Sequence, residues 1–169
     1  MPTITKEQAA ALGRKAQQPK REAGELLAVF VPGPVKNPLN GSHGHWTKRA
    51  RWAKGWRDKT SQAVLEGVPL YRCSTNGLVL GDVRVIPETP KRVVFLARTH
   101  NRMDDDNLRA ALKPCRDGLR DMRVIHDDDP RSGHEFVYTQ TIDRAHRGVE
   151  IRVTLRDTPV EGAQETPHV

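Results

Sequence analysis

Cysteine is scarce in this chain, and long apolar segments are absent from it. Only Cys73 and Cys115 occur, and neither belongs to a C-x-x-C pair, so no disulfide framework is indicated and both are expected to be reduced thiols. No apolar run approaches the roughly 20 residues that cross a bilayer, and residues 1–20 lack the apolar core of a signal peptide. We therefore expect a soluble protein of the cytoplasm.

Negative charge is in the minority. The chain has 28 Lys and Arg against 21 Asp and Glu, a formal net charge of +7. Such a balance favours an anionic partner, and nucleic acid is the commonest; the alternative is a basic protein without one. With 169 residues, of which 36% are hydrophobic, the chain can form one domain with a modest core.

Polarity divides the chain into three segments. Residues 1–24 form a polar arm, either a short helix or a flexible segment, residues 25–156 form the domain, and residues 157–169 are expected to be a disordered tail. An apolar run at 25–31 predicts a buried strand, and the prolines after it enforce a loop through Asn40. Helical spacing predicts a helix from Trp46 to about Leu65. Its expected buried face comprises Trp52, Ala53, Trp56, Thr60, Ala63 and Val64.

The second half of the domain alternates strands with one more helix. Residues 78–86 and 92–97 read as two strands of a hairpin around the turn 87–90. A second helix is expected to begin with Asp106 or Asn107 as its N-cap and to be kinked or split at Pro114. Residues 136–141 and 149–155 predict closing strands. The order β-α-β-β-α-β-β indicates an α+β fold, a single domain with a mixed β-sheet and two main helices.

Two acidic runs flank the second predicted helix, Asp104-Asp105-Asp106 and Asp127-Asp128-Asp129. Adjacent carboxylates repel one another, so such clusters are costly without a compensating cation, and oxygen ligands suit Mg²⁺ or Mn²⁺. In an extended segment Asp104 and Asp106 would point to the same side. If the helix returns the chain so that the second run lies beside the first, the carboxylates could hold one or two ions against a scissile phosphate.

Each run also has a simpler interpretation. Asp106 could serve only as a helix N-cap, and the second run could be an ordinary acidic turn before Pro130. A calcium-binding loop is excluded because Leu108 and Arg131 stand where Asp or Asn is expected.

The sequence around the two acidic runs is specific. Residues 103–119 read MDDDNLRAALKPCRDGL, and residues 124–131 read VIHDDDPR. This sequence resembles the RusA family of Holliday junction resolvases, whose pattern has D-x-D-N-L opening a helix, an acidic residue with a small one and Leu at the helix end, then a D-D pair. The resemblance spans roughly residues 28–155, including Asn40 after the Pro-rich turn and His45-Trp46. The residues that match the helix pattern are Asp104, Asp106, Asn107, Leu108, Asp117 and Leu119.

The resemblance implies a RusA-like nuclease domain at 25–156 and a set of metal ligands. In that family the two aspartates of D-x-D and the second of the D-D pair bind Mg²⁺, which makes Asp104 and Asp106 the first two ligands. Three successive aspartates leave the third open, with Asp128 favoured over Asp127.

A family lysine that assists catalysis has no direct counterpart. It stands three residues after the motif Asn, where this chain has Ala110. Lys113, on the helical face of Asp106, and Arg109 are the two candidates to replace it. Either could neutralise a phosphate in the transition state or be a solvated surface charge.

A stripe of basic residues follows Trp46 along the first predicted helix. It could track a phosphate backbone or be a solvated face, whereas Trp52 and Trp56 are expected in the core. His43 and His45 are expected to be loop residues, and His126 to bond a carboxylate. The expected DNA contacts are Lys48, Arg49, Arg51, Lys54, Arg57 and Arg109.

Together these features predict a crossover junction endodeoxyribonuclease that uses Mg²⁺, or Mn²⁺, to hydrolyse phosphodiesters in branched DNA. The resemblance implies a homodimer, as does the two-fold symmetry of paired nicks in a four-way junction. Family members occur in phages and prophages, which makes a phage or prophage source consistent with the sequence. Two alternatives remain: a non-catalytic DNA-binding protein on the same scaffold, and a metal-dependent nuclease without junction preference.

Overall fold

A computed structural model describes residues 19–36, 46–67, 70–74, 77–80, 83–127 and 129–156. Its elements are β1 (Glu25–Pro32), α2 (Trp46–Gly67), β2 (Leu70–Ser74), β3 (Gly77–Leu80), β4 (Val83–Val85), β5 (Lys91–Thr99), α3 (Asp105–Asp121), the 3₁₀ turn η1 (Pro130–Ser132), β6 (Glu135–Ile142) and β7 (Gly148–Leu155). Most of the expected arm, the whole of the expected tail at 157–169, and the residues Asn40, His43, His45 and Asp128 lie outside these ranges.

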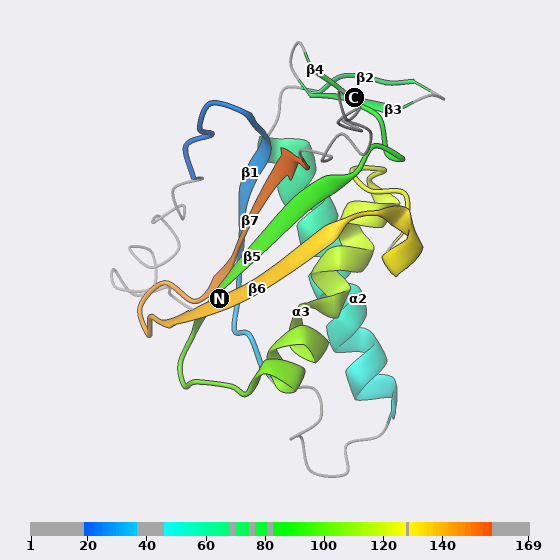
Figure 1. Ribbon diagram of the computed structural model, residues 1–169. Coiled ribbons are helices and arrows are strands. Elements are labelled where there is room, and N and C mark those ends of the chain that lie inside the picture. The colour runs from blue at the N-terminus through cyan, green and yellow to red at the C-terminus, as the bar shows by residue number, and fades with distance from the viewer. Residues whose placement is uncertain are drawn as a thin grey trace, which may run out of the picture.

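The main sheet has four strands in the order β1-β7-β5-β6. β7 is antiparallel to both β1 and β5, whereas β6 is parallel to β5. The parallel pair needs a long crossover, and α3 supplies it by carrying the chain back along the sheet from the end of β5 to the start of β6 (Figure 1). The chain is therefore an α+β domain with a mixed sheet and two helices, as expected.

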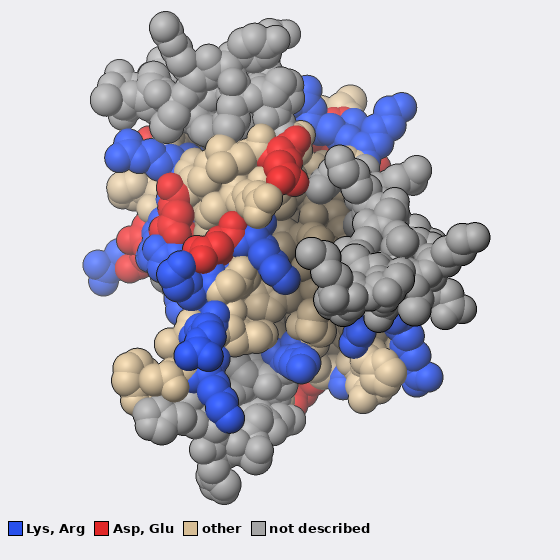
Figure 2. Space-filling view, turned by 180° about the vertical axis from the view of Figure 1, so that it is seen from behind, with Lys and Arg blue, Asp and Glu red and all other residues tan. Residues whose placement is uncertain are grey.

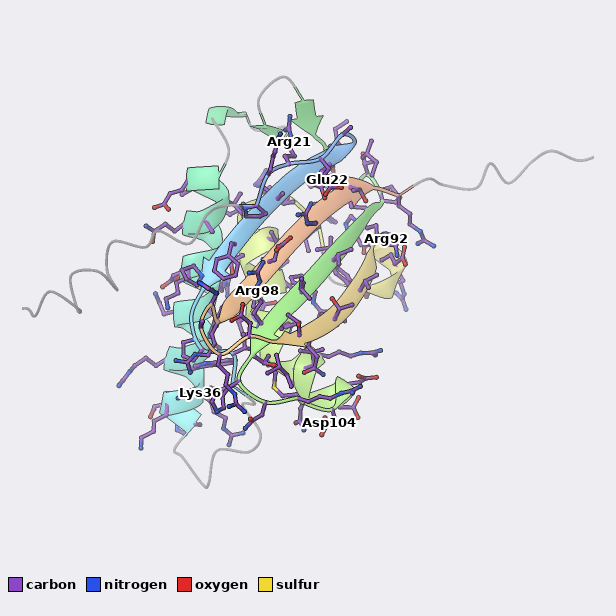
Figure 3. The ribbon with its side chains drawn as sticks, turned by 90° about the vertical axis from the view of Figure 1, so that its left-hand side faces the viewer. Arg21, Glu22, Lys36, Arg92, Arg98 and Asp104 are labelled. Atoms are coloured by element: carbon purple, nitrogen blue, oxygen red, sulfur yellow. The ribbon has the colours of Figure 1, made fainter. Side chains whose placement is uncertain are left out.

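Both helices cover one face of the sheet, and the core lies between these layers (Figure 1). β5 shows the alternation that produces it. Val93, Phe95 and Ala97 are fully buried beneath the helices, while Val94 and Leu96 between them are half-buried on the other face. Among the described helices, none covers that second face, which we call the open face (Figure 3).

α2 and α3 lie side by side and begin at the same end of the molecule (Figure 1). Gly118 makes their close approach feasible, because a Cβ there would come within 2.8 Å of Arg57 O and of Thr60 Cβ. The Arg57 guanidinium joins the helices through two hydrogen bonds to Asp121, and it holds the pKa of that carboxyl below its usual range. The buried face of α2, with Trp56 and Thr60, is the predicted one.

The expected hairpin between residues 78–86 and 92–97 is wrong. The first segment forms two strands, β3 and β4, in a separate three-stranded sheet with β2, which had not been predicted. β5 is an interior strand whose two edges are taken by β7 and β6, so it has no edge left for β4. Only Gly81 and Asp82 separate the paired residues Leu80 and Val83, a spacing typical of tight hairpins.

α3 differs from expectation at its start and at its proline. Its N-cap is Asp104, two residues before the earlier of the two expected caps. Asp105 and Asp106 are already helical, so the three aspartates do not form the extended segment that was expected. Pro114 does not split the helix, which runs through it for 17 residues with the proline ring buried. No helix of the described segments has the length and apolarity to cross a membrane.

Candidate metal and nucleic-acid sites

The start of α3 is built around Asp104. This residue has an extended backbone, and its carboxylate accepts hydrogen bonds from Asn107 N at 2.9 Å and from Asn107 Nδ2 at 2.6 Å. The cap therefore satisfies a free helix N–H, and the Asn107 amide fixes the carboxylate. Asp104 and Asn107 of the D-x-D-N-L motif thus have a structural role in this chain.

The preceding residue is held by the neighbouring strand. Gln140 of β6 accepts from Met103 N at 2.9 Å and donates to Met103 O at 2.5 Å, which fixes the backbone just before the cap. Asp105 and Asp106 follow in the first helical turn with exposed side chains. Their charges suit the positive end of the helix dipole, and their exposure leaves their oxygens accessible to a cation.

The second acidic run belongs to the loop between α3 and β6. Asp129 Oδ1 accepts from Arg131 N at 2.8 Å, and Asp129 O accepts from Ser132 Oγ at 2.6 Å, so this aspartate closes the η1 turn. Asp127 is exposed. His126 Nδ1 lies 3.9 Å from Glu88 Oε1, a separation too long for the expected carboxylate hydrogen bond.

A buried lysine and histidine join this loop to the sheet. Lys91 is fully buried, and its Nζ donates to the carbonyl oxygens of Ile86 at 2.6 Å, Pro87 at 3.2 Å and Thr89 at 2.8 Å. Its backbone N–H donates to His134 Nδ1 at 3.1 Å. Burial lowers the pKa of Lys91 to about 8, and burial followed by the nearby Lys91 charge lowers the pKa of His134.

The two acidic runs lie at opposite ends of the sheet. The first follows β5 at Thr99, whereas the second precedes β6, whose Glu135 pairs with Arg92 near the start of β5. Figure 3 shows Asp104 and Arg92 at these two ends. The 17 residues of α3 separate the runs by about 25 Å.

Because of this separation, the described residues of the two acidic runs in one chain cannot bind the same metal ion. The donor type suits Mg²⁺, and the first run offers exposed oxygens. However, the described residues contain no group of three His, Cys, Asp or Glu side chains placed to hold one ion. The expected proximity of Asp104 and Asp106 to Asp127 is therefore not found within one chain, and Asp128 is not described.

The candidates for the assisting cation are both engaged with neighbours. Lys113 Nζ lies 3.2 Å from Asp117 Oδ1, one turn along α3. The Arg109 guanidinium lies 6.0 Å from the centre of the Tyr138 ring, at the limit of a cation–π contact. Both side chains are exposed and lie on the helix that begins with the first acidic run.

The basic residues of α2 are concentrated in its first half. Lys48, Arg49 and Arg51 are exposed, and the first turn of the helix contains no acidic residue. Positive charge at a helix N-terminus opposes the helix dipole, so the arrangement costs helix stability unless an anion compensates. Figure 2 shows basic side chains spread over the described surface, with acidic ones in smaller groups.

Further along α2 the basic residues have partners. Lys54 Nζ lies 2.7 Å from Asp58 Oδ2, with side chains 75% and 60% exposed, and so weak a pair can exchange for a phosphate. Arg57, by contrast, is bound to Asp121, and the Lys59 ammonium lies 5.9 Å from the centre of the Trp56 ring. Arg57 thus joins the two helices, and its expected contact with DNA stays a prediction.

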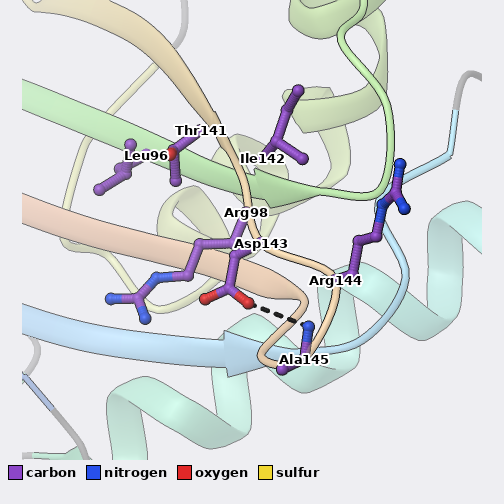
Figure 4. A pocket seen from close by; sticks show the side chains of 7 residues that line it. All are labelled: Leu96, Arg98, Thr141, Ile142, Asp143, Arg144 and Ala145. Carbon is purple, nitrogen blue, oxygen red and sulfur yellow. Dashed lines mark hydrogen bonds between the residues drawn. The ribbon is translucent and has the colours of Figure 1, made fainter.

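The open face carries charge over β7 and β5. The Glu150 carboxylate accepts from Arg152 Nε at 2.7 Å and from Arg98 Nη2 at 2.9 Å. Burial raises the pKa of Glu150, but these two hydrogen bonds outweigh burial and hold it below the usual range. Beside Arg98 an open hollow of about 600 Å³ lies at the turn after β6, lined also by Asp143 and Arg144 (Figure 4). No residue of either acidic run lines it.

Gln140, Lys91 and His134 are the site-supporting residues that sequence reasoning missed. The sequence indicates only that Gln140 belongs to an alternating strand. Its side-chain amide bonds the backbone of Met103, which is 37 residues away in the chain. Lys91 and His134 are separated by 43 residues, so their contact depends on the parallel pairing of β5 with β6. Neither the family models nor the curated proteins searched give a match to this chain.

Proposed function

We propose that this protein is a Mg²⁺-dependent endonuclease that hydrolyses phosphodiester bonds in branched DNA, chiefly four-way junctions. The sequence resemblance to the RusA family supports the reaction class, through D-x-D-N-L at Asp104–Leu108 and the second acidic run. The net charge of +7 supports a nucleic-acid partner.

One observation carries the proposal furthest: the basic half of α2 and the first acidic run lie at the same end of the molecule. The helices begin at that end side by side (Figure 1), Lys48 and Arg51 being exposed on one and Asp105 and Asp106 on the other. A phosphate backbone held by the basic residues would pass close to the carboxylates. Binding and cleavage groups would then act on neighbouring phosphates.

The metal site of this proposal needs two copies of the chain. Within one chain the runs are separated by the length of α3, so Asp104 and Asp106 of one copy would share an ion with Asp127 or Asp128 of another. A homodimer with a two-fold axis forms two such sites. Paired nicks on the symmetric strands of a junction need two sites in that relation.

Bound Mg²⁺ would supply an activated water and offset charge on the phosphate. The protein's own groups would do the rest. Asn107 fixes the Asp104 carboxylate, and Lys48 and Arg51 would bind flanking phosphates. Lys113, which lies one helical turn from Asp117 on α3, would neutralise charge on the cleaved phosphate.

The test is cleavage of a synthetic four-way junction by the purified protein. We expect nicks with Mg²⁺ and none with EDTA, and slower cleavage of a linear duplex of the same sequence. Equal cleavage of both substrates would indicate a nuclease without junction preference. No cleavage of either, despite junction binding, would overturn the nuclease proposal.

That last outcome would favour a non-catalytic DNA-binding protein. The separation of the acidic runs within one chain supports this second candidate, as does Ala110 in the place of the family lysine. The two candidates differ in the effect of metal. Only the nuclease would nick the junction in Mg²⁺ and lose that nicking in EDTA or in Asp106→Asn, whereas junction binding would persist in both candidates.

A further inference from the structure

β6 is an edge strand with a free side. It pairs with β5 through eight consecutive residues, from Arg92↔Glu135 to Thr99↔Ile142. It is the last strand in the order β1-β7-β5-β6, and no described residue pairs with its other side. An unpaired edge of this length offers backbone N–H and C=O groups to any strand that approaches.

Natural proteins protect such edges with prolines, charged residues, bulges or short strands. β6 has none of these between Phe136 and Ile142, where the sequence is FVYTQTI, and its register with β5 is unbroken. The opposite edge strand is different. β1 ends at Pro32 and has a register shift between Glu25 and Leu27. The contrast indicates that the β6 edge is kept free for a partner strand.

We propose that β6 pairs antiparallel with β6 of a second copy, so that the two four-stranded sheets join into one of eight strands. Two identical strands pair antiparallel about a two-fold axis, which makes the contact self-complementary. In the register centred on Tyr138, Glu135 faces Thr141 and Val137 faces Thr139. The only charged residue of the strand, Glu135, therefore meets no like charge.

The pairing also relates the acidic runs of the two copies, a step that rests on the proposed function. Asp104 lies beside the last residues of β6 through the contact of Met103 with Gln140. The loop with Asp127 and Asp129 leads into the first residues of β6. Antiparallel strands bring the end of one beside the start of the other. The first run of each copy is thus placed at the same end as the second run of its partner.

The open face is the competing surface for self-association. It carries half-buried Val94 and Leu96 and the Arg98–Glu150–Arg152 network. Charged groups over the middle of a face disfavour stacking on an identical face, whereas the middle of β6 carries none. Variants on the two surfaces distinguish them.

The test measures the mass of the full chain by analytical ultracentrifugation as a function of concentration. Thr139→Lys places a charge in the middle of the β6 edge, where its side chain is exposed. Thr139 pairs with Leu96 and therefore also lies on the open face, so stacking of two open faces would be weakened by a charge on either β6 or β7, whereas edge pairing would be weakened only by the charge on β6. Thr154→Lys places the same charge on the open face of the interior strand β7 and is the matched control. We expect a wild-type dimer, a dissociation constant at least about tenfold higher for Thr139→Lys, and no change for Thr154→Lys.

A second variant tests the register of the proposed β6–β6 pair, and it remains informative if Thr139→Lys does not fold. Val137→Cys with Thr139→Cys puts thiols opposite each other across the proposed pair, within the reach of a disulfide. Oxidation should give a covalent dimer that the wild-type chain does not give. A monomeric wild type, a dimer weakened by Thr154→Lys as much as by Thr139→Lys, or the absence of the covalent dimer would overturn the proposal. Each readout is independent of metal and cleavage, so a failed interface is distinguishable from a failed nuclease.

Discussion

Two residues of the D-x-D-N-L motif stabilise the start of α3, independently of any metal that they bind. Asp104 caps α3 and Asn107 holds its carboxylate, so the motif would favour a helix start even without chemistry. Sequence alone placed the cap at Asp106 or Asn107, because Asp and Asn are all good caps and four of them stand in succession. The choice depends on where Gln140 fixes the preceding backbone, which no local pattern contains.

Asp106→Asn separates the two roles at one position. Asp106 is exposed and makes no cap, so the substitution should leave the free energy of unfolding nearly unchanged. If the carboxylate binds the metal, cleavage should be abolished while junction binding stays intact or becomes slightly tighter, because a negative charge near DNA phosphates is removed. Cleavage rate in limiting Mg²⁺ and junction affinity are the measurements.

Asp104 supplies the control for this substitution. Asp104→Asn keeps the cap, whereas Asp104→Ala removes it and should cost about 1 kcal/mol of stability. Both should lose cleavage if Asp104 is a ligand. Wild-type cleavage by Asp106→Asn would show that the proposed metal site is wrong.

His134 should make stability depend on pH. Its Nδ1 accepts the Lys91 N–H only when the ring is neutral, and its pKa is lowered from 6.5 in the folded state. The unfolded chain therefore binds the proton first as the pH falls. The free energy of unfolding should decrease below pH 6.5 and level off below the folded pKa.

Denaturant unfolding at several pH values between 5 and 8 checks this, with the range set by the ordinary pKa of histidine of about 6.5. His134→Asn keeps an acceptor without a titrating group and should flatten the dependence. His126→Asn, at an exposed histidine, should not. An unchanged slope in His134→Asn would contradict the role given to this hydrogen bond.

At the scale of elements, sequence periodicity predicts which face of a single helix or strand is buried. The face of α2 with Trp56, Thr60 and Val64 follows from helical spacing, as does the alternation of β5. The pairing of strands could not be obtained in this way. β4 pairs with β3 because β7 and β6 occupy both edges of β5. Both of these strands begin more than 35 residues after the end of β5, so a local pattern cannot predict the pairing.

Gly118 tests the helix pair directly. A Cβ at this position would lie 2.8 Å from Arg57 O, so Gly118→Ala should destabilise the fold by about 1–3 kcal/mol, despite the better helix propensity of Ala. Gly55→Ala is the control, since nothing lies within 4 Å of a Cβ there, and it should stabilise by about 0.5–1 kcal/mol. Chemical denaturation measures both. Equal effects would mean that the helices do not meet at Gly118.

The basic half of α2 should set the salt dependence of DNA binding. Each phosphate neutralised contributes about −0.9 to the log–log slope on duplex DNA. Replacing Lys48, Arg51 and Lys54 with Ala should therefore flatten the slope by about 2 to 3. Lys59→Ala, whose side chain lies over Trp56, should change it little. An unchanged slope in the triple variant would mean that this half of α2 is only solvated surface.

For the whole molecule, the sequence predicted the residue types of a site but not their distance. Twenty residues lie between the two acidic runs in the chain, and the helix predicted there was expected to bring the second run beside the first. A continuous helix instead holds its ends apart, and Pro114 does not shorten it. The expected closeness of the two runs is not found among the described residues, because the unbroken helix carries the chain from one end of the sheet to the other.

Mixing two inactive variants tests whether sites are shared between chains. Asp106→Asn and Asp128→Asn should each be inactive alone. In a mixed dimer with shared sites, one site receives both substitutions and the other receives neither, so cleavage should return to about a quarter of wild type after random mixing. Single-strand nicking of a junction is the measurement. No recovery, with mixed dimers shown to form, would place each site within one chain.

The unbroken length of α3 has a consequence for spacing. A rigid helix works as a ruler: it keeps the two ends of α3 about 25 Å apart, with the first acidic run at one end and the loop of the second run at the other. In a two-fold dimer the same ruler sets the distance between the two nicks. Inserting four residues into α3 would lengthen it by about 6 Å. Because the two sites are equivalent by symmetry, the spacing between the two nicks should change and both nicks should move symmetrically.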